Sequence, residues 1–178
     1  MEGTLARPGV WGGANWGGGA FDPETGMLYL KTVGMAQVFR IQKRDPDAPT
    51  NRPGEVDAEY VNRGAPAFFG DGLPLIKPPY AHLVAIDLNK GTQLWQVAHG
   101  ETPDFIKNNP LMKGITIPRT GQSGILGVMA TKTLLICGDC GLFTDELGRK
   151  AARLRAYDKM TGQEVGAVFL AQAQSGSP

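Results

Sequence analysis

Short apolar segments separated by polar turns recur along the chain, and helical periodicity is weak throughout. Three turns share one pattern, Asp-x-x-x-Gly, in which Gly follows Asp by four residues: Asp22–Gly26, Asp87–Gly91 and Asp158–Gly162. Asp accepts backbone N–H bonds at the start of such a turn, and Gly tolerates the positive φ near its end. The flanking segments are apolar or aromatic and only a few residues long, which predicts antiparallel hairpins.

The predicted strands form two groups of four. The first group covers residues 17–22, 27–33, 81–87 and 92–98, and the second covers 123–130, 132–138, 152–158 and 163–170. Two four-stranded antiparallel units in series are typical of β-propeller blades. We therefore expect an all-β fold with one blade at about 17–98 and another at about 123–170. An ordinary β-sandwich with similar turns remains the alternative on pattern alone.

Two stretches do not follow the hairpin rhythm. Residues 42–80 are rich in proline and acidic side chains, and we expect a long surface insertion there within the first blade. Residues 99–122 form a second long connection. Loops of this length in a compact domain usually carry function or cover another element.

Composition excludes several classes of partner. The 178 residues contain 18 Lys and Arg against 17 Asp and Glu, a net charge of +1, which gives no reason to expect nucleic acid. No apolar run has the length of a membrane span, and the first ten residues do not resemble a signal peptide. The 25 glycines and 13 prolines fit a chain with frequent turns.

Two segments resemble the pyrroloquinoline quinone (PQQ)-dependent dehydrogenases. The segment Gly12–Tyr29, with its Gly-Gly-Ala-Asn-Trp start, is similar to a segment of that family. The segment Ala85–Trp95 looks like the family's tryptophan-docking motif, in which Trp packs on the next blade while Asp and Gly shape the turn. The segment Leu154–Gly162 is a second match, but Gly166 stands where the motif has Trp, which weakens one blade contact.

The resemblance covers nearly the whole chain and implies the C-terminal part of an eight-bladed propeller, nearest the glucose-dehydrogenase-like branch. Such an enzyme holds PQQ and Ca²⁺, oxidises a sugar or alcohol in the periplasm, and passes electrons to a quinone or a cytochrome. The family's catalytic Asp and most of its Ca²⁺ ligands lie outside the matched region. We therefore assign no catalytic or metal-binding residue here, and expect a fragment that is inactive without the remaining blades.

The resemblance implies that Asn15 hydrogen-bonds PQQ and that Trp16 forms a flat wall beside it. An amide suits this task because it can both donate and accept a hydrogen bond. The structural alternative is a turn Asn followed by a Trp that packs between blades. The surrounding glycines lack the strand–helix context of a nucleotide-binding loop, and close backbone approach at a propeller centre explains them better.

Other reactive side chains give weaker signals. Cys137 and Cys140 form a CxxC pair, which is half of a zinc site at most, and either a local disulfide or two incidental thiols would fit. The two histidines, His82 and His99, have no spaced carboxylate to orient them, so we expect structural or surface roles.

Two further hypotheses remain open beside the enzyme. The chain could be a non-catalytic β-propeller module that binds a partner or serves as a scaffold. Alternatively, blades from several copies could assemble into a closed ring, because open blade faces favour association.

Overall fold

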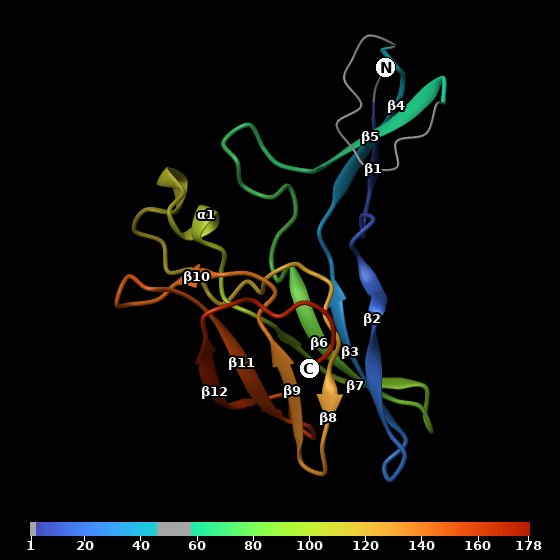
Figure 1. The fold of residues 1–178 in the computed structure, drawn as a ribbon, viewed down its shortest axis with the longest axis vertical. Helices are drawn as coiled ribbons and strands as arrows, with labels where there is room; N and C mark the ends of the chain where they lie inside the picture. Colours follow the sequence, from blue (N-terminus) through green and yellow to red (C-terminus); the bar gives the residue numbers. More distant parts are fainter. Residues whose placement is uncertain (1–2, 46–57) are drawn as a thin grey trace.

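The computed structural model describes residues 3–45 and 58–178, and its first sheet is a four-stranded antiparallel meander (Figure 1). The strands follow in chain order: β2 (Gly13–Asp22), β3 (Met27–Val33), β6 (Ala81–Asp87) and β7 (Thr92–Ala98). This sheet confirms the first predicted group of strands, although β2 begins earlier than expected.

The second sheet has the same meander order with one short addition. Its strands are β8 (Met129–Ala130), β9 (Leu134–Gly138), β11 (Lys150–Asp158) and β12 (Glu164–Leu170), and β10 (Phe143–Thr144) pairs with the start of β11. The predicted strand 123–130 was wrong over most of its length. Leu126 instead forms a parallel bridge with Gly176 near the end of the chain, so the residues before β8 do not pair with β9.

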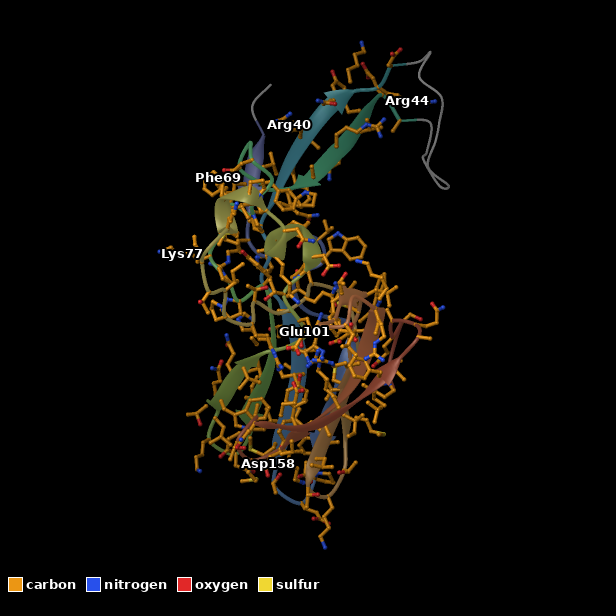
Figure 2. The ribbon with its side chains drawn as sticks, turned by 90° about the vertical axis from the view of Figure 1, so that its left-hand side faces the viewer. Arg40, Arg44, Phe69, Lys77, Glu101 and Asp158 are labelled. Carbon is orange, nitrogen blue, oxygen red and sulfur yellow. The ribbon has the colours of Figure 1, made fainter. Side chains whose placement is uncertain are left out.

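A third, smaller sheet projects from this body and carries the N-terminal end of the described chain (Figure 1). It consists of β1 (Thr4–Ala6), β4 (Gln37–Lys43) and β5 (Tyr60–Pro66). The expected insertion 42–80 therefore contains a strand that the sequence analysis missed, because β5 is mostly exposed and its residues show no clear apolar alternation. Residues 46–57 of the insertion lie outside the described residues. Arg40 on this sheet lies at the opposite end of the molecule from Asp158 (Figure 2).

Among the residues that the structure describes, helical structure is confined to the second long connection. It contains α1 (Asp104–Lys107) and the 3₁₀ turn η1 (Pro110–Met112). Within the described ranges, no helix is both long and apolar enough to cross a membrane. The predicted all-β fold is confirmed.

The Asp-to-Gly turns have the local chemistry that the sequence predicts. Asp158 Oδ1 accepts the backbone N–H groups of Met160 and Thr161, both at 2.9 Å, and Gly162 has a φ of +72°. The turns at Asp22 and Asp87 close in the same way, with Gly26 at +69° and Gly91 at +66°. Each turn fixes the register of the strands that it joins.

The two large sheets share one hydrophobic core. Tyr29, Leu83 and Ala85 from the first sheet are fully buried in the same cluster as Leu135 and Tyr157 from the second. Trp95 is half-buried and its ring lies 6.1 Å from that of Tyr29. The core therefore lies between the sheets, as expected for neighbouring blades.

Trp95 joins the outer strand of the first sheet to a turn of the second. Its indole Nε1–H donates to the Lys159 carbonyl at 3.2 Å. Its six-membered ring covers Gly162 so closely that a Cβ added there would lie 2.7 Å from Cε3. This is the inter-blade contact that the resemblance implied for Trp95, and it requires glycine at position 162.

A nearly buried ion pair also joins the same two sheets. Lys159 Nζ lies 2.6 Å from Asp22 Oδ2, and Thr25 donates to the same oxygen at 2.6 Å. The Lys159 and Thr25 hydrogen bonds lower the pKa of Asp22 to about 2. The turn of one blade thus holds the first hairpin of the other.

We expect Trp95→Phe to lower the free energy of unfolding by about 1–3 kcal/mol, because it removes the bond to Lys159 and part of the contact with Gly162. Urea denaturation would measure this change. Trp16→Phe is the matched control, since the Trp16 side chain is 88% exposed and should shift stability by less than about 0.5 kcal/mol. Equal effects of the two substitutions would contradict this role for Trp95.

The Asp22–Lys159 pair also predicts a dependence of stability on pH. Because folding lowers the pKa of Asp22 from 3.8 to about 2, its contribution is present above about pH 4 and is lost as the pH falls towards 2. The stability difference between wild type and Asp22→Asn should therefore shrink over that interval. In a Lys159→Met background most of this pH dependence should disappear, and its persistence there would assign the effect to another group.

Candidate functional site

The two residues expected to contact a cofactor lie on a bulge in β2, an edge strand of its sheet. Ala14 pairs with Thr32 and Gly19 pairs with Leu30, so four residues, 15–18, stand opposite the single residue Lys31. A bulge bends its strand and redirects side chains, and bulges are frequent beside active sites. Asn15 and Trp16 thus lie where β2 departs from its regular pairing with β3.

Asn15 keeps hydrogen-bonding capacity for a ligand. Its Oδ1 accepts the Trp16 backbone N–H at 2.7 Å, which fixes the orientation of the amide. Its Nδ2 makes only a long contact of 3.4 Å with the Val10 carbonyl. The amide N–H₂ group is therefore the part of Asn15 that can still donate to an oxygen of a bound molecule.

Trp16 is the most exposed large apolar side chain of the described residues, with 88% of its surface accessible. It differs in this respect from Trp95, which packs at the core. The alternative of a Trp that packs between these two blades is therefore not what the structure shows. Its flat indole face is open to a planar group from outside the chain.

Three segments converge on the backbone beside this bulge. Ser177 Oγ donates to the Gly17 carbonyl at 3.4 Å, and Gly127 N–H donates to the Gly176 carbonyl at 3.1 Å. A Cβ at Gly17 would lie 2.6 Å from the carbonyl carbon of Leu126. The two backbone segments are therefore too close for any residue other than glycine at position 17. The close backbone approach expected for the glycine-rich entry is confirmed at Gly17.

Lys31 is a buried cation near this point that the sequence analysis did not single out. Its side chain is almost inaccessible and Nζ donates to the Gly124 carbonyl. Burial lowers the pKa of Lys31, and no described residue forms an ion pair with it. The burial of Lys31 could have been inferred from the alternation of residues along β3, because Lys31 shares a face with Met27, Tyr29 and Val33, and that face is buried.

The CxxC segment is built into the core and carries two free thiols. Cys137 Sγ lies 3.3 Å from His99 Nε2, and burial raises the pKa of Cys137 to about 12. The pKa of Cys140 is raised by burial as well. Neither residue is therefore poised as a thiolate nucleophile.

His99 has the structural role expected of it. Its Nε2 lies 2.9 Å from the Gly138 carbonyl and its Nδ1 lies 2.9 Å from the Tyr157 hydroxyl, so a neutral ring donates to the carbonyl and accepts from the hydroxyl. Burial lowers the pKa of His99 to about 3. His82 is only partly buried, and its pKa is lowered by burial and by Arg7.

A buried charge cluster surrounds Arg155. Its guanidinium binds Asp139 through two bonds of 2.8 and 3.0 Å and also contacts Glu101 and Glu164. Glu101, which is labelled in Figure 2, also accepts from Arg153 at 2.7 Å. These charges neutralise one another. In residues 3–45 and 58–178, no group of three or more His, Cys, Asp or Glu side chains could hold a metal ion.

A cavity of about 600 Å³ lies beside the candidate site. Neither Asn15 nor Trp16 lines it, but Gly9 and Trp11 do, and these two residues flank the Val10 carbonyl that Asn15 approaches. Its other walls come from residues 33–37, the insertion, the connection that contains α1, residues 121–124, and Leu142 and Lys150 of the second sheet region. The sequence analysis did not predict this cavity.

Comparison with known proteins identifies the family. The sequence pattern of a family described as "PQQ: Glucose/ethanol/alcohol dehydrogenase, beta-propeller domain" matches residues 1–178. The chain belongs to this family of PQQ-dependent dehydrogenases. The resemblance noted from the sequence, including its glucose-dehydrogenase-like character, is thereby confirmed.

Two curated relatives show the extent of the match. The quinate/shikimate dehydrogenase (quinone) of Acinetobacter baylyi is 26% identical over 188 aligned residues, which cover 98% of this chain and 22% of that protein. The quinoprotein glucose dehydrogenase of Gluconobacter oxydans is 24% identical over 92% of this chain and 22% of its own length. The chain thus spans about a fifth of the length of these relatives.

The fold also matches solved quinoprotein structures. The quinohemoprotein alcohol dehydrogenase of Comamonas testosteroni superposes with a TM-score of 0.57 at 17% identity, over 98% of this chain and 22% of that one. A quinohemoprotein alcohol dehydrogenase of Pseudomonas putida gives a TM-score of 0.54 at 18% identity. These likenesses support the β-propeller architecture of the family in this chain.

The bulge has features that suit the family's planar cofactor. PQQ carries quinone and carboxylate oxygens, which can accept from the Asn15 amide, and an aromatic plane, which can cover the open face of Trp16. The buried charge of Lys31 lies opposite the bulge in the same sheet. The residues present therefore fit PQQ.

We expect Gly17→Ala to lower the free energy of unfolding by about 1–3 kcal/mol, because the added methyl group would overlap the Leu126 backbone. Gly166→Ala is the matched control, since a Cβ there meets no atom within 4 Å. Chemical denaturation of both variants would measure the difference. A neutral Gly17→Ala would show that the approach of these segments is not close in solution.

Proposed function

We propose that this chain supplies two adjacent propeller blades and one side of the cofactor pocket of a PQQ-dependent dehydrogenase that oxidises a sugar or an alcohol. The observation that carries the proposal is the β2 bulge, where the Asn15 amide and the open face of Trp16 stand beside the convergence of both sheets. PQQ, when bound, would supply the redox chemistry by accepting two electrons from the substrate.

The residues of the chain would bind and orient the cofactor. The Asn15 Nδ2 would donate to a quinone or carboxylate oxygen, and Trp16 would cover one face of the ring and exclude water from it. The positive charge of Lys31 would favour a cofactor that bears carboxylates. Ca²⁺ would belong to the complete enzyme, with ligands from outside this chain.

The proton acceptor for the substrate hydroxyl would also come from outside the chain. The pKa of His99 is about 3 and its ring is buried, and the carboxylates of Asp139 and Glu101 are bound by arginines. We therefore propose that the chain needs the remaining blades for activity. Exposed apolar side chains on β12 suit contact with a further blade: Val165, Val168 and Phe169.

Electrons would leave PQQ for a quinone or a cytochrome, and the periplasm is the compartment that we propose. The Acinetobacter baylyi relative is named for quinate, shikimate and a quinone, and the Gluconobacter oxydans relative is named for glucose, which supports a quinone acceptor and a hydroxyl-bearing substrate. A non-catalytic propeller module would share the docking turns but would not need a donor and an open indole face on a bulge. A ring formed by several copies would use the same exposed strands, and light scattering of the purified protein would distinguish a monomer from such an assembly.

We expect PQQ to quench tryptophan fluorescence of the purified protein that contains this chain, because a bound quinone would lie against Trp16. Trp16→Phe should remove most of this quenching, whereas Trp11→Phe should leave most of it. Asn15→Ala should weaken PQQ binding by about five- to tenfold, the effect of one lost hydrogen bond. Asn15→Asp should weaken it further, since a carboxylate would repel the carboxylates of PQQ.

Absence of saturable quenching at high PQQ concentration would contradict the proposed function and favour the scaffold module. Quenching that persists unchanged in Trp16→Phe would place PQQ elsewhere in the protein. Circular dichroism of each variant would confirm that the sheets are intact.

A further inference from the structure

The cavity beside the candidate site has an apolar wall that is unusual for a sugar pocket. Most of its lining side chains are aromatic or aliphatic, among them Trp11, Met35, Phe68, Phe105 and Leu142. Phe68 and Phe105 meet edge to face with ring centroids 5.9 Å apart. Such a wall favours a ligand whose body is apolar.

Gln37 provides a hydrogen-bond donor in this wall. The residue is only 6% exposed, and its Oε1 accepts the Val10 backbone N–H at 2.6 Å. That bond identifies Oε1 as the acceptor end of the amide and Nε2 as the donor end. The Nε2 group has no hydrogen-bond partner among residues 3–45 and 58–178, and it is not sealed within the protein. This N–H₂ group is therefore free to donate to an oxygen of a bound molecule.

Tyr80 provides a second polar group. The residue lines the cavity and is also 6% exposed, and burial raises the pKa of its hydroxyl. Its hydroxyl has no hydrogen-bond partner within the described part of the chain and is likewise not sealed off. It can donate or accept one hydrogen bond. Gln122 also lines the cavity, and its buried Oε1 has no hydrogen-bond partner among the described residues. Three polar groups without a partner therefore lie in a mostly apolar wall.

The charged groups of the lining are already paired. Asp104 accepts from the Thr144 backbone N–H at 3.0 Å, from the Thr144 hydroxyl at 2.6 Å, and from Lys150. These bonds hold the pKa of Asp104 at about 2. Asp104 and Lys150 therefore leave no unpaired charge in the cavity wall for an ionic ligand.

We propose that this cavity binds an uncharged, largely apolar alcohol, such as an aryl or alicyclic alcohol, and discriminates against sugars. The hydroxyl would accept from Gln37 Nε2 and donate to Tyr80 Oη, while the ring lies against Phe68 and Phe105. A sugar would place several hydroxyl groups against apolar side chains without partners, which is unfavourable.

This inference rests on the proposed function, because it assigns the substrate class to the dehydrogenase. The cavity adjoins the β2 bulge through Val10, whose carbonyl contacts Asn15 and whose N–H is held by Gln37. The same backbone segment thus connects the proposed alcohol site to the proposed cofactor site.

The test is binding of benzyl alcohol and of glucose to the purified protein without PQQ, measured by calorimetry or ligand-detected NMR. We expect benzyl alcohol to bind roughly 100-fold or more tightly than glucose, since at least two sugar hydroxyls would stay unpaired. Tyr80→Phe and Gln37→Glu should each weaken the binding of benzyl alcohol by about five- to tenfold. Tyr60→Phe is the matched control, because Tyr60 is exposed on β5 and outside the cavity.

Several results would overturn the proposal. Equal or tighter binding of glucose would reject the substrate class, and tighter binding of duroquinone than of benzyl alcohol would assign the cavity to an electron acceptor. Unchanged affinity in both Tyr80→Phe and Gln37→Glu would place the alcohol elsewhere. The wild-type preference tests the inference even if a variant fails to fold. Because PQQ is absent, failure here is distinguishable from failure of the PQQ quenching experiment.

Discussion

The contact of Trp95 with the Gly162 turn joins two sheets that share no backbone ladder among the described residues. The Asp22–Lys159 ion pair joins the same sheets at the first hairpin. With these contacts in place, Tyr29 and Leu83 pack in the same buried cluster as Leu135, and β2 lies beside the residues that precede β8. The close approach at Gly17, and with it the position of the bulge, depends on this docking.

The interior uses its titratable groups for structure. Arg155 and Asp139 neutralise each other, and His99 bridges Tyr157 and Gly138 as a neutral ring. Burial also keeps the Cys137 thiol protonated. Such groups provide rigidity and specific packing, but no base or nucleophile at neutral pH. A family whose redox chemistry belongs to a bound quinone is consistent with an interior of this kind.

The connections between strands give the chain its individual character. The Asp-to-Gly turns recur in both large sheets, whereas the insertion and the α1 connection each occur once among the described residues and both contribute to the wall of the cavity. Binding residues on loops above a rigid scaffold are a general route to new specificity. Relatives named for glucose and quinate share the scaffold at about a quarter identity, so their substrates need not match an apolar wall.

The sequence by itself determined the hairpins and the division into two strand groups, and the family resemblance implied the docking role of Trp95. These features have local causes, since Asp caps each turn and Gly accepts its positive φ, and Trp95 belongs to a motif of contiguous residues. The buried place of Lys31 could also have been predicted from alternation along β3. Only the tertiary structure decided that Leu126 pairs with Gly176, that β4 and β5 form a hairpin, and that Gln37 and Tyr80 line one cavity. Those features join residues that are far apart in the sequence, and packing rather than local preference brings them together.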